Sequence, residues 1–226
     1  MMPSTTASRW SPAGIFGLLE HPSYPLVFMR FRTNTLIGLQ DYCANLRLAS
    51  LFRHLPGAIV ECGTWKGGMI AGLVSVFGTG HSYYLFDSFE GLPPAKEIDG
   101  ERALRWQADN DLDNCRASIE YARSAMKRAG IDNAQIVKGW FENTLPGRRI
   151  GGGILLLRID GDWYDSTMCI LENLFPQVIP GGCVIIDDYQ CWDGCAMAVH
   201  DFLSRNKRSE RIGLFNDRVS FLIKRH

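Results

Sequence analysis

Short apolar runs alternate with stretches of helical periodicity along most of this chain. Between residues 36 and 55 the apolar positions recur at about helical spacing, and Pro56-Gly57 ends that pattern. Farther along, several apolar runs have the length of strands: Ala58–Cys62, Ser82–Phe86, Ala134–Val137, Ile154–Ile159 and Cys183–Asp187. Segments that predict helices lie between and after these runs: Lys66–Phe77, Asn114–Ala129, Ser166–Phe175 and Cys195–Leu203. The last two runs predict a closing hairpin: Arg211–Phe215 and Val219–Ile223.

This alternation predicts an α/β fold with a parallel sheet and helices on both faces. The run at 154–159 reads as uniformly apolar, which is typical of a strand covered on both faces. In such a sheet, ligands bind beyond the carboxyl ends of the strands. Each of the five strands expected before the hairpin ends on acidic residues or glycine: Glu61 with Gly63, then Asp87, Gly139, Asp160, and the pair Asp187-Asp188. One such carboxylate could cap a helix, but the repetition favours a binding site at this edge.

Composition narrows the class of protein. A length of 226 residues and a hydrophobic fraction of 46% suit one globular domain. Lys plus Arg equals Asp plus Glu at 24 each, so the formal net charge is zero. This balance does not indicate binding to nucleic acid or to an acidic membrane. No apolar run reaches the roughly 18 residues that a membrane-spanning helix needs. The seven cysteines are interpreted as reduced thiols, and without a signal-peptide pattern they predict a cytoplasmic protein.

The N-terminal segment stands apart from this pattern. Residues 1–30 combine four prolines with several aromatic residues and are expected to be poor in regular structure. We therefore divide the chain into an N-terminal arm or lid, residues 1–32, and one α/β domain, residues 33–226. The apolar character of the arm predicts a contact with a second subunit or over a substrate pocket.

The segment Glu61–Gly68 predicts a turn from strand to helix that approaches a ligand. Its glycines permit a sharp turn, and the helix that follows offers free amide groups. The spacing is neither G-x-G-x-x-G nor that of a phosphate-binding loop. Asp87, at the end of the next strand, can accept hydrogen bonds from both hydroxyls of a ribose, or can simply cap a helix. Trp140 and Phe141, after Gly139, suit either a purine ring or the core.

The densest candidate chemistry lies at the ends of two strands that should be neighbours. Asp160, Asp162, Asp187 and Asp188 would meet there, and their mutual repulsion must be offset, most simply by a hard divalent cation. Oxygen ligands with no histidine nearby favour Mg²⁺, Ca²⁺ or Mn²⁺ over zinc or iron. Helix caps and unrelated surface acids are the alternative interpretation.

Five stretches carry these residues: Val60–Gly67 (VECGTWKG), Leu85–Pro93 (LFDSFEGLP), Gly139–Pro146 (GWFENTLP), Arg158–Thr167 (RIDGDWYDST) and Pro180–Gly194 (PGGCVIIDDYQCWDG). Together they resemble the macrocin O-methyltransferase family, enzymes that methylate sugar hydroxyls in antibiotic biosynthesis. The resemblance spans about residues 34 to 223. It implies a class I, Rossmann-like methyltransferase fold with a seven-stranded, mostly parallel sheet. It also implies S-adenosylmethionine as cofactor, dependence on Mg²⁺, and a homodimer.

By position, the resemblance implies metal ligation by Asp160, Asp187 and Asp188. It implies cofactor contacts at Glu61, Gly63 and Asp87. Residues of the same loops are expected to complete the cofactor site: Thr64, Ser88, Gly139, Trp140 and Phe141.

Methyl transfer from a sulfonium to a hydroxyl requires that the hydroxyl lose its proton. A divalent cation would lower the pKa of that hydroxyl, and a nearby carboxylate would accept the proton. Asp162 is our candidate base, provided that the chain turns at Gly161. The alternative is that Asp162 caps the helix that begins near Asp165–Ser166.

The expected acceptor is a small molecule, a sugar hydroxyl or vicinal diol of a natural product, with no nucleic acid or membrane partner. Two other functions stay open at this point. One is an oxidoreductase that uses a nucleotide cofactor, and the other is a non-catalytic binding protein on the same fold.

Overall fold

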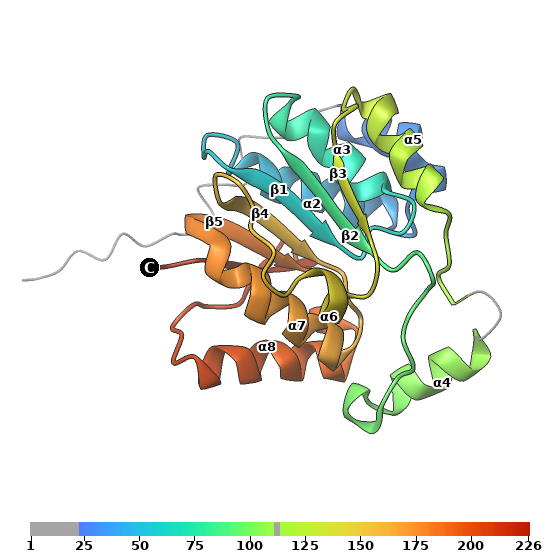
Figure 1. Ribbon diagram of the computed structural model, residues 1–226, viewed down its shortest axis with the longest axis vertical. Helices are drawn as coiled ribbons and strands as arrows, with labels where there is room; N and C mark the ends of the chain where they lie inside the picture. Colours follow the sequence, from blue (N-terminus) through green and yellow to red (C-terminus); the bar gives the residue numbers. More distant parts are fainter. Residues whose placement is uncertain (1–22, 111–113) are drawn as a thin grey trace, which may run out of the picture.

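A seven-stranded sheet lies at the centre of the computed structural model, which describes residues 23–110 and 114–226 (Figure 1). The strand order is β3-β2-β1-β4-β5-β7-β6. Strands β1 to β5 run parallel, whereas β7 is antiparallel to both β5 and β6. The strands are β1 Ala58–Cys62, β2 Tyr83–Asp87, β3 Gln135–Lys138, β4 Ile154–Ile159, β5 Val178–Ile186, β6 Gly213–Phe215 and β7 Val219–Ile223. The α/β class and the mostly parallel sheet are therefore confirmed.

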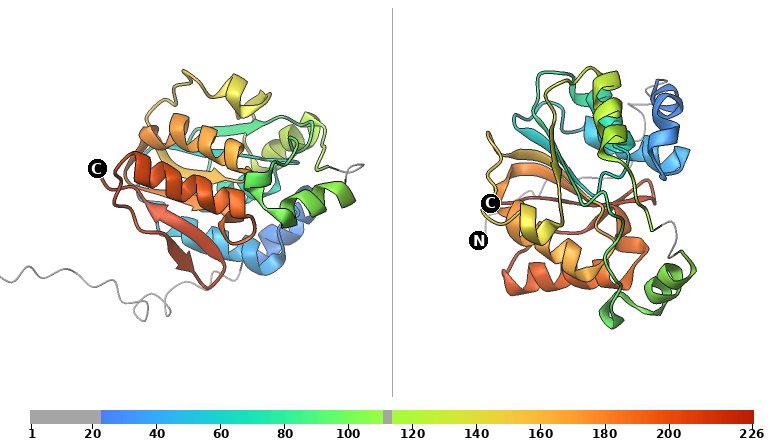
Figure 2. Two further views of the ribbon diagram at one scale, coloured as in Figure 1. Left: turned by 90° about the horizontal axis from the view of Figure 1, so that it is seen from below. Right: turned by 45° about the vertical axis from the view of Figure 1, so that its right-hand side comes forward.

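Helices cover both faces of the sheet (Figures 1 and 2). They are α1 Tyr24–Phe31, α2 Leu39–Ser50, α3 Gly68–Phe77, α4 Glu101–Asp109, α5 Ile119–Ala129, α6 Phe141–Thr144, α7 Tyr164–Leu174 and α8 Asp193–Arg205. One face carries α1, α2, α3 and α5, and the other carries α6, α7 and α8. Helix α4 lies outside both of these helical layers in Figure 1.

Alternating side chains along the strands build two cores. All residues of β1 are buried. Ile59 packs in the core beneath α2 and α3, whereas Val60 packs in the core beneath α7 and α8. Burial on both faces is the reason why this strand reads as a continuous apolar run in the sequence.

The prediction that residues 1–30 are poor in regular structure is wrong for the end of that segment. Tyr24–Phe31 forms helix α1, and both of its end residues are buried. Pro25 lies in the first turn, where its missing N–H has no partner within the helix anyway. Phe28 meets Tyr42 of α2 edge to face, with 5.4 Å between the ring centroids. The rest of the expected arm, residues 1–22, lies outside the described residues.

Two other differences concern helices. The sequence patterns predict no helix between residues 88 and 110, where α4 lies. The helix expected from Asn114 begins only at Ile119, because the hydroxyl of Ser118 caps it and accepts from the amide of Glu120 at 3.3 Å.

The ends of β1 and β4 lie side by side at the centre of the sheet, where a crevice opens beyond them. Gly63, directly after β1, has φ +84°, and a Cβ atom added there would lie 1.7 Å from the carbonyl oxygen of Asp160. The amide of Asp160 donates to the carbonyl oxygen of Cys62 at 2.9 Å. Only glycine permits this approach, so the glycine of the predicted turn serves the contact between β1 and β4.

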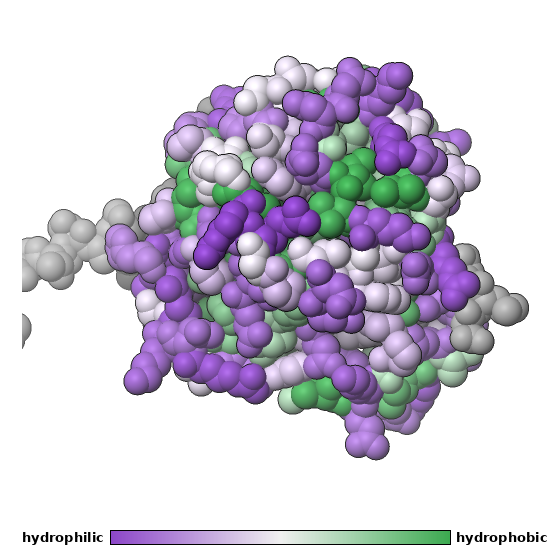
Figure 3. Space-filling view, viewed as in Figure 1, coloured by the Kyte–Doolittle hydropathy of each residue, from purple (hydrophilic) through white to green (hydrophobic). Residues whose placement is uncertain are grey.

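The surface is polar over most of the face seen in Figure 3, and its apolar side chains lie in separate small patches. Among the described residues, the most exposed large apolar side chains are Leu26, Leu36 and Met29, at 71, 69 and 55%. Within residues 23–110 and 114–226, no helix has the length and apolar character needed to cross a membrane.

Candidate functional site

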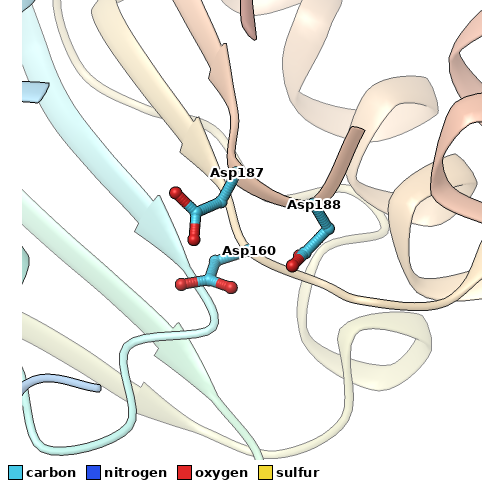
Figure 4. A group of neighbouring side chains, drawn as sticks. All are labelled: Asp160, Asp187 and Asp188. Carbon is cyan, nitrogen blue, oxygen red and sulfur yellow. The ribbon is translucent and has the colours of Figure 1, made fainter. Parts of the chain in front are cut away.

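Three aspartates meet in the crevice beyond β4 and β5 (Figure 4). Asp160 follows β4, and Asp187 and Asp188 begin a short 3-10 helix directly after β5. One carboxylate oxygen from each lies within 4.8 Å of the other two, and the described part of the chain holds no other such group of acids, thiols or histidines. The side chains of Asp160 and Asp187 are 26% and 25% exposed. The structure thus brings together the residues that the strand ends predict, with Asp160 and Asp187 partly open to the crevice and Asp188 buried beside them.

A buried arginine lies behind these aspartates. Arg158, on β4, is 1% exposed, and its guanidinium is 2.6 Å from a carboxylate oxygen of Asp160 and 2.6 Å from one of Asp187. The same group is 3.1 Å from Glu61. The interpretation of residues 154–159 as uniformly apolar overlooks this cation, although a single charge inside an apolar run is a signal for it. The protein itself therefore offsets part of the repulsion among these acids, for which the sequence suggests only a bound cation.

Glu61 presents a buried oxygen without a partner. Its side chain is 1% exposed, and Oε1 pairs with Arg158 whereas Oε2 has no hydrogen bond. Burial raises the pKa of Glu61 to about 8, against the lowering effect of Arg158. The buried hydroxyl of Thr64 also lacks a partner. Buried polar atoms without partners beside a cavity favour a ligand that completes their hydrogen bonds.

One cleft of about 530 Å³ connects these groups. Acidic residues that line it are Asp41, Glu61, Asp87, Asp160, Asp162, Asp187 and Asp188. A narrower space of about 50 Å³ shares Gly63 and Asp87 with the cleft and is lined by Ser88, Trp140 and Phe141. Gly139 lines neither space, and its amide instead donates to the carbonyl oxygen of Asp87 at 2.9 Å. Every other residue expected at the cofactor lines one of the two spaces.

The carboxylate of Asp87 holds two loops in place. Its Oδ2 accepts from the amide of Trp65 at 2.7 Å, and its Oδ1 accepts from the amide of Phe89 at 2.6 Å. Both donors have positive φ, 46° and 57°, which is uncommon for residues other than glycine. Burial raises the pKa of Asp87, and these amides act in the opposite direction. Asp87 therefore shapes the loops after β1 and β2, in addition to any contact with a ribose.

Asp162 lines the cleft, but not through the expected turn at Gly161. Asp162 itself has φ +54°, and Gly161 does not have positive φ. The amide of Asp162 donates to Oδ2 of Asp188 at 3.0 Å, and its Oδ1 accepts from Nε1 of Trp192 at 3.1 Å. Burial raises the pKa of Asp162 to about 8. The alternative role as a helix cap is wrong, because α7 has Trp163 as its N-cap and no side-chain cap bond.

The donor set of the crevice fits a hard divalent cation. Carboxylate oxygens are ligands that Mg²⁺ prefers, and Asp160, Asp187 and Asp188 supply them within one small space. Burial raises the pKa of Asp187 to about 6 and that of Asp188 well above its usual range. A bound cation would stabilise the charged forms of these groups.

The chain matches known proteins over most of its length. The family model described as Macrocin-O-methyltransferase (TylF) matches residues 36–221. The 8-demethyl-8-(2,3-dimethoxy-alpha-L-rhamnosyl)-tetracenomycin-C 4'-O-methyltransferase of Streptomyces olivaceus is 38% identical over 192 residues, which cover 79% of this chain and 71% of that protein. Mycinamicin III 3''-O-methyltransferase of Micromonospora griseorubida is 29% identical over 84% of this chain and 76% of its own length. The solved structure of the O-methyltransferase NovP has a TM-score of 0.73 and 25% identity, with 85% of this chain and 83% of that chain covered.

Proposed function

The chain belongs to the macrocin O-methyltransferase family and is an O-methyltransferase, and from that premise we propose that it uses S-adenosylmethionine and Mg²⁺ to methylate a sugar hydroxyl of a natural product. The observation that carries this proposal is the group of Asp160, Asp187 and Asp188 in a cleft that also contains the glycine turn. The oxidoreductase and binding-protein hypotheses are set aside, because the relatives are named as O-methyltransferases.

The cofactor is proposed to lie along the ends of β1, β2 and β3. Asp87 would accept from the ribose hydroxyls. The free Oε2 of Glu61 suits the amino group of the methionine moiety, since it is a buried acceptor without a donor. Trp140 and Phe141 would flank the purine. Residues of the same loops complete the proposed contacts: Gly63, Thr64, Ser88 and Gly139, the last through its backbone.

The reaction centre is proposed to lie between the cofactor and the acids. Asp160, Asp187 and Asp188 would hold Mg²⁺, which when bound lowers the pKa of an acceptor hydroxyl and fixes its position. Asp162 accepts the hydroxyl proton while the oxygen bonds to the methyl carbon, and the carbon–sulfur bond breaks with its electrons going to sulfur. Arg158 orients the carboxylate of Asp160, since its Nη1 donates to Oδ2 of Asp160 at 2.6 Å.

The acceptor is proposed to be a sugar, because the name of the S. olivaceus relative places a rhamnosyl group on its substrate. We also propose a homodimer in the cytoplasm. Exposed apolar residues that a second subunit would cover are Leu26 and Met29 on α1, Leu36 before α2 and Leu39 at its first position.

The test is calorimetric titration with S-adenosylmethionine, followed by turnover with and without Mg²⁺. The acceptors are the rhamnosyl-tetracenomycin of the S. olivaceus relative and methyl α-L-rhamnopyranoside. We expect cofactor binding and a methylated product that forms only when Mg²⁺ is present. Absence of cofactor binding would overturn the proposal, and full turnover in EDTA would remove its metal.

Asp87→Ala is expected to weaken cofactor binding by about tenfold to a hundredfold, the loss of one or two hydrogen bonds to a charged group. The variant also releases the amides of Trp65 and Phe89, so the loops after β1 and β2 lose their common anchor. Calorimetry measures the dissociation constant, and Asp132→Ala at an exposed position is the control. Unchanged affinity in Asp87→Ala would show that the ribose lies elsewhere.

A further inference from the structure

Three tryptophans from separate segments meet beside Asp162. Trp106 lies on α4, Trp163 precedes α7 and Trp192 precedes α8. Their ring centroids are 5.3 to 6.4 Å apart, and each pair meets edge to face. Trp163 is buried, whereas Trp106 and Trp192 are partly exposed and line the cleft of the acids. Trp106 and Trp192 therefore form part of the wall of the reaction site, whereas Trp163 lies in the core behind them.

Trp192 contacts Asp162 directly. Its indole Nε1 donates to Oδ1 of Asp162 at 3.1 Å. The amide of Asp162 is bonded at the same time to Asp188, and φ of Asp162 lies in the left-handed region at +54°. Such a conformation persists where the surroundings over-determine it. Because the indole occupies Oδ1, the second carboxylate oxygen stays available to a substrate proton.

Helix α4 fixes the indole from its other side. The guanidinium carbon of Arg102 lies 5.0 Å from the centroid of the Trp192 ring, and its Nη1 donates to the carbonyl oxygen of Cys191 at 3.2 Å. Trp106 meets the same indole at 6.2 Å between centroids. Arg102 and Trp106 are four residues apart and so share one face of α4. Among the residues of α4 only Ala103 is buried, so these side-chain contacts are a large part of its attachment.

We propose that Trp192 is a positioning residue for methyl transfer, and that its indole N–H orients the carboxylate of Asp162 toward the acceptor while Arg102 and Trp106 hold the indole. The inference rests on the proposed function, in which Asp162 is the base. Because Trp192 lines the cleft, an acceptor bound there contacts the same indole ring. The indole then serves both the binding of the acceptor and the orientation of Asp162.

Trp192→Phe tests this role because it keeps an aromatic ring and removes only the N–H donor. We expect kcat for the rhamnosyl-tetracenomycin to fall by about tenfold to a hundredfold, the effect of a misplaced catalytic group. The KM for S-adenosylmethionine should stay within about threefold, since Trp192 is not among the proposed cofactor contacts. Asp162→Asn should lower kcat by about a hundredfold or more. The double variant should be no slower than Asp162→Asn alone, because Trp192 acts through Asp162.

Trp163→Phe is the matched control. It also removes one indole hydrogen bond, from Nε1 to the carbonyl oxygen of Pro93 at 2.9 Å, and it lies in the same aromatic cluster. Its melting temperature should fall, but its kcat should stay within about threefold of the parent, because this bond does not reach Asp162.

An NMR spectrum of the protein labelled with ¹⁵N-tryptophan reports on the hydrogen bond between Trp192 and Asp162 and does not depend on turnover. The chain has six tryptophans, and the indole signal lost in Trp192→Phe is that of Trp192. In Asp162→Ala this signal should move upfield and exchange faster with water, while the signal of Trp163 stays in place.

The outcomes separate this inference from the proposed function. An unmoved Trp192 signal in Asp162→Ala would overturn the inference. So would normal kcat in Trp192→Phe, or losses that multiply in the double variant. Normal turnover in Asp162→Asn would remove the base and this inference together, but it would leave Mg²⁺-dependent methyl transfer standing.

Discussion

Replacement of Arg158 by leucine is expected to lower the free energy of unfolding by about 3–5 kcal/mol, the cost of leaving buried charges uncompensated. For a chain of this size, that loss lowers the melting temperature by roughly 6–20 °C. The guanidinium pairs with Glu61, Asp160 and Asp187 from a position that is 1% exposed. Without it, these neighbouring carboxylates repel one another with no guanidinium between them. Thermal denaturation followed by circular dichroism in EDTA measures the change.

Arg123→Ala is the control for this experiment. Arg123 pairs with Glu120 at the surface, where the side chains are 58% and 65% exposed, so its loss should cost no more than about 0.5 kcal/mol. Added Mg²⁺ should raise the melting temperature of Arg158→Leu by more than that of the parent, because a bound cation replaces the lost charge. Equal melting temperatures for the parent and Arg158→Leu would contradict the role of Arg158 described above.

Asp160→Asn is expected to lower turnover by at least about a thousandfold, because the several kcal/mol that a bound metal supplies to the reaction are lost. Asparagine has the shape of aspartate, so the backbone contact between Asp160 and Gly63 persists and cofactor affinity should change little. EDTA should reduce the parent to the same level and should not slow Asp160→Asn further. Initial rates with the rhamnosyl-tetracenomycin, with and without added Mg²⁺, measure this.

Asp165→Asn is the matched control, since Asp165 is exposed and pairs with Lys96 outside the cleft. Its turnover should stay within about threefold of the parent. Full activity of Asp160→Asn in EDTA would show that the acids act without a metal.

The sequence predicts the acid group well, because it depends only on strand ends. The bounds of β4 match the prediction, and neighbouring parallel strands bring Asp160 to Asp187 whatever the side chains between them do. The orientation of Arg158 could not be predicted in this way, since a charge in a strand reveals neither its face nor its partners. Its three partners lie on or directly after three strands that only the sheet order brings together.

The backbone conformation of Asp162 and the position of α4 also could not be predicted from the neighbouring residues in the sequence. Glycine at position 161 suggests the turn, yet Asp162 takes the positive φ because Asp188 and Trp192 hold it from about 30 residues away. Helix α4 buries only Ala103 among its own residues, so its apolar pattern is weak. Its position is set by tertiary contacts, among them those of Arg102 and Trp106 with Trp192.

The close contact of Gly63 with the carbonyl oxygen of Asp160 divides the molecule into parts that tolerate change differently. A Cβ atom at position 63 would lie 1.7 Å from the carbonyl oxygen of Asp160. The turn after β1 and the end of β4 can therefore change only together. Helix α4 is joined to the same cleft by side chains, through Arg102 and Trp106. A library that seeks new acceptors should therefore vary α4 at positions other than Arg102 and Trp106 and leave the β1–β4 junction untouched. Related enzymes should differ most in the segment between β2 and α5.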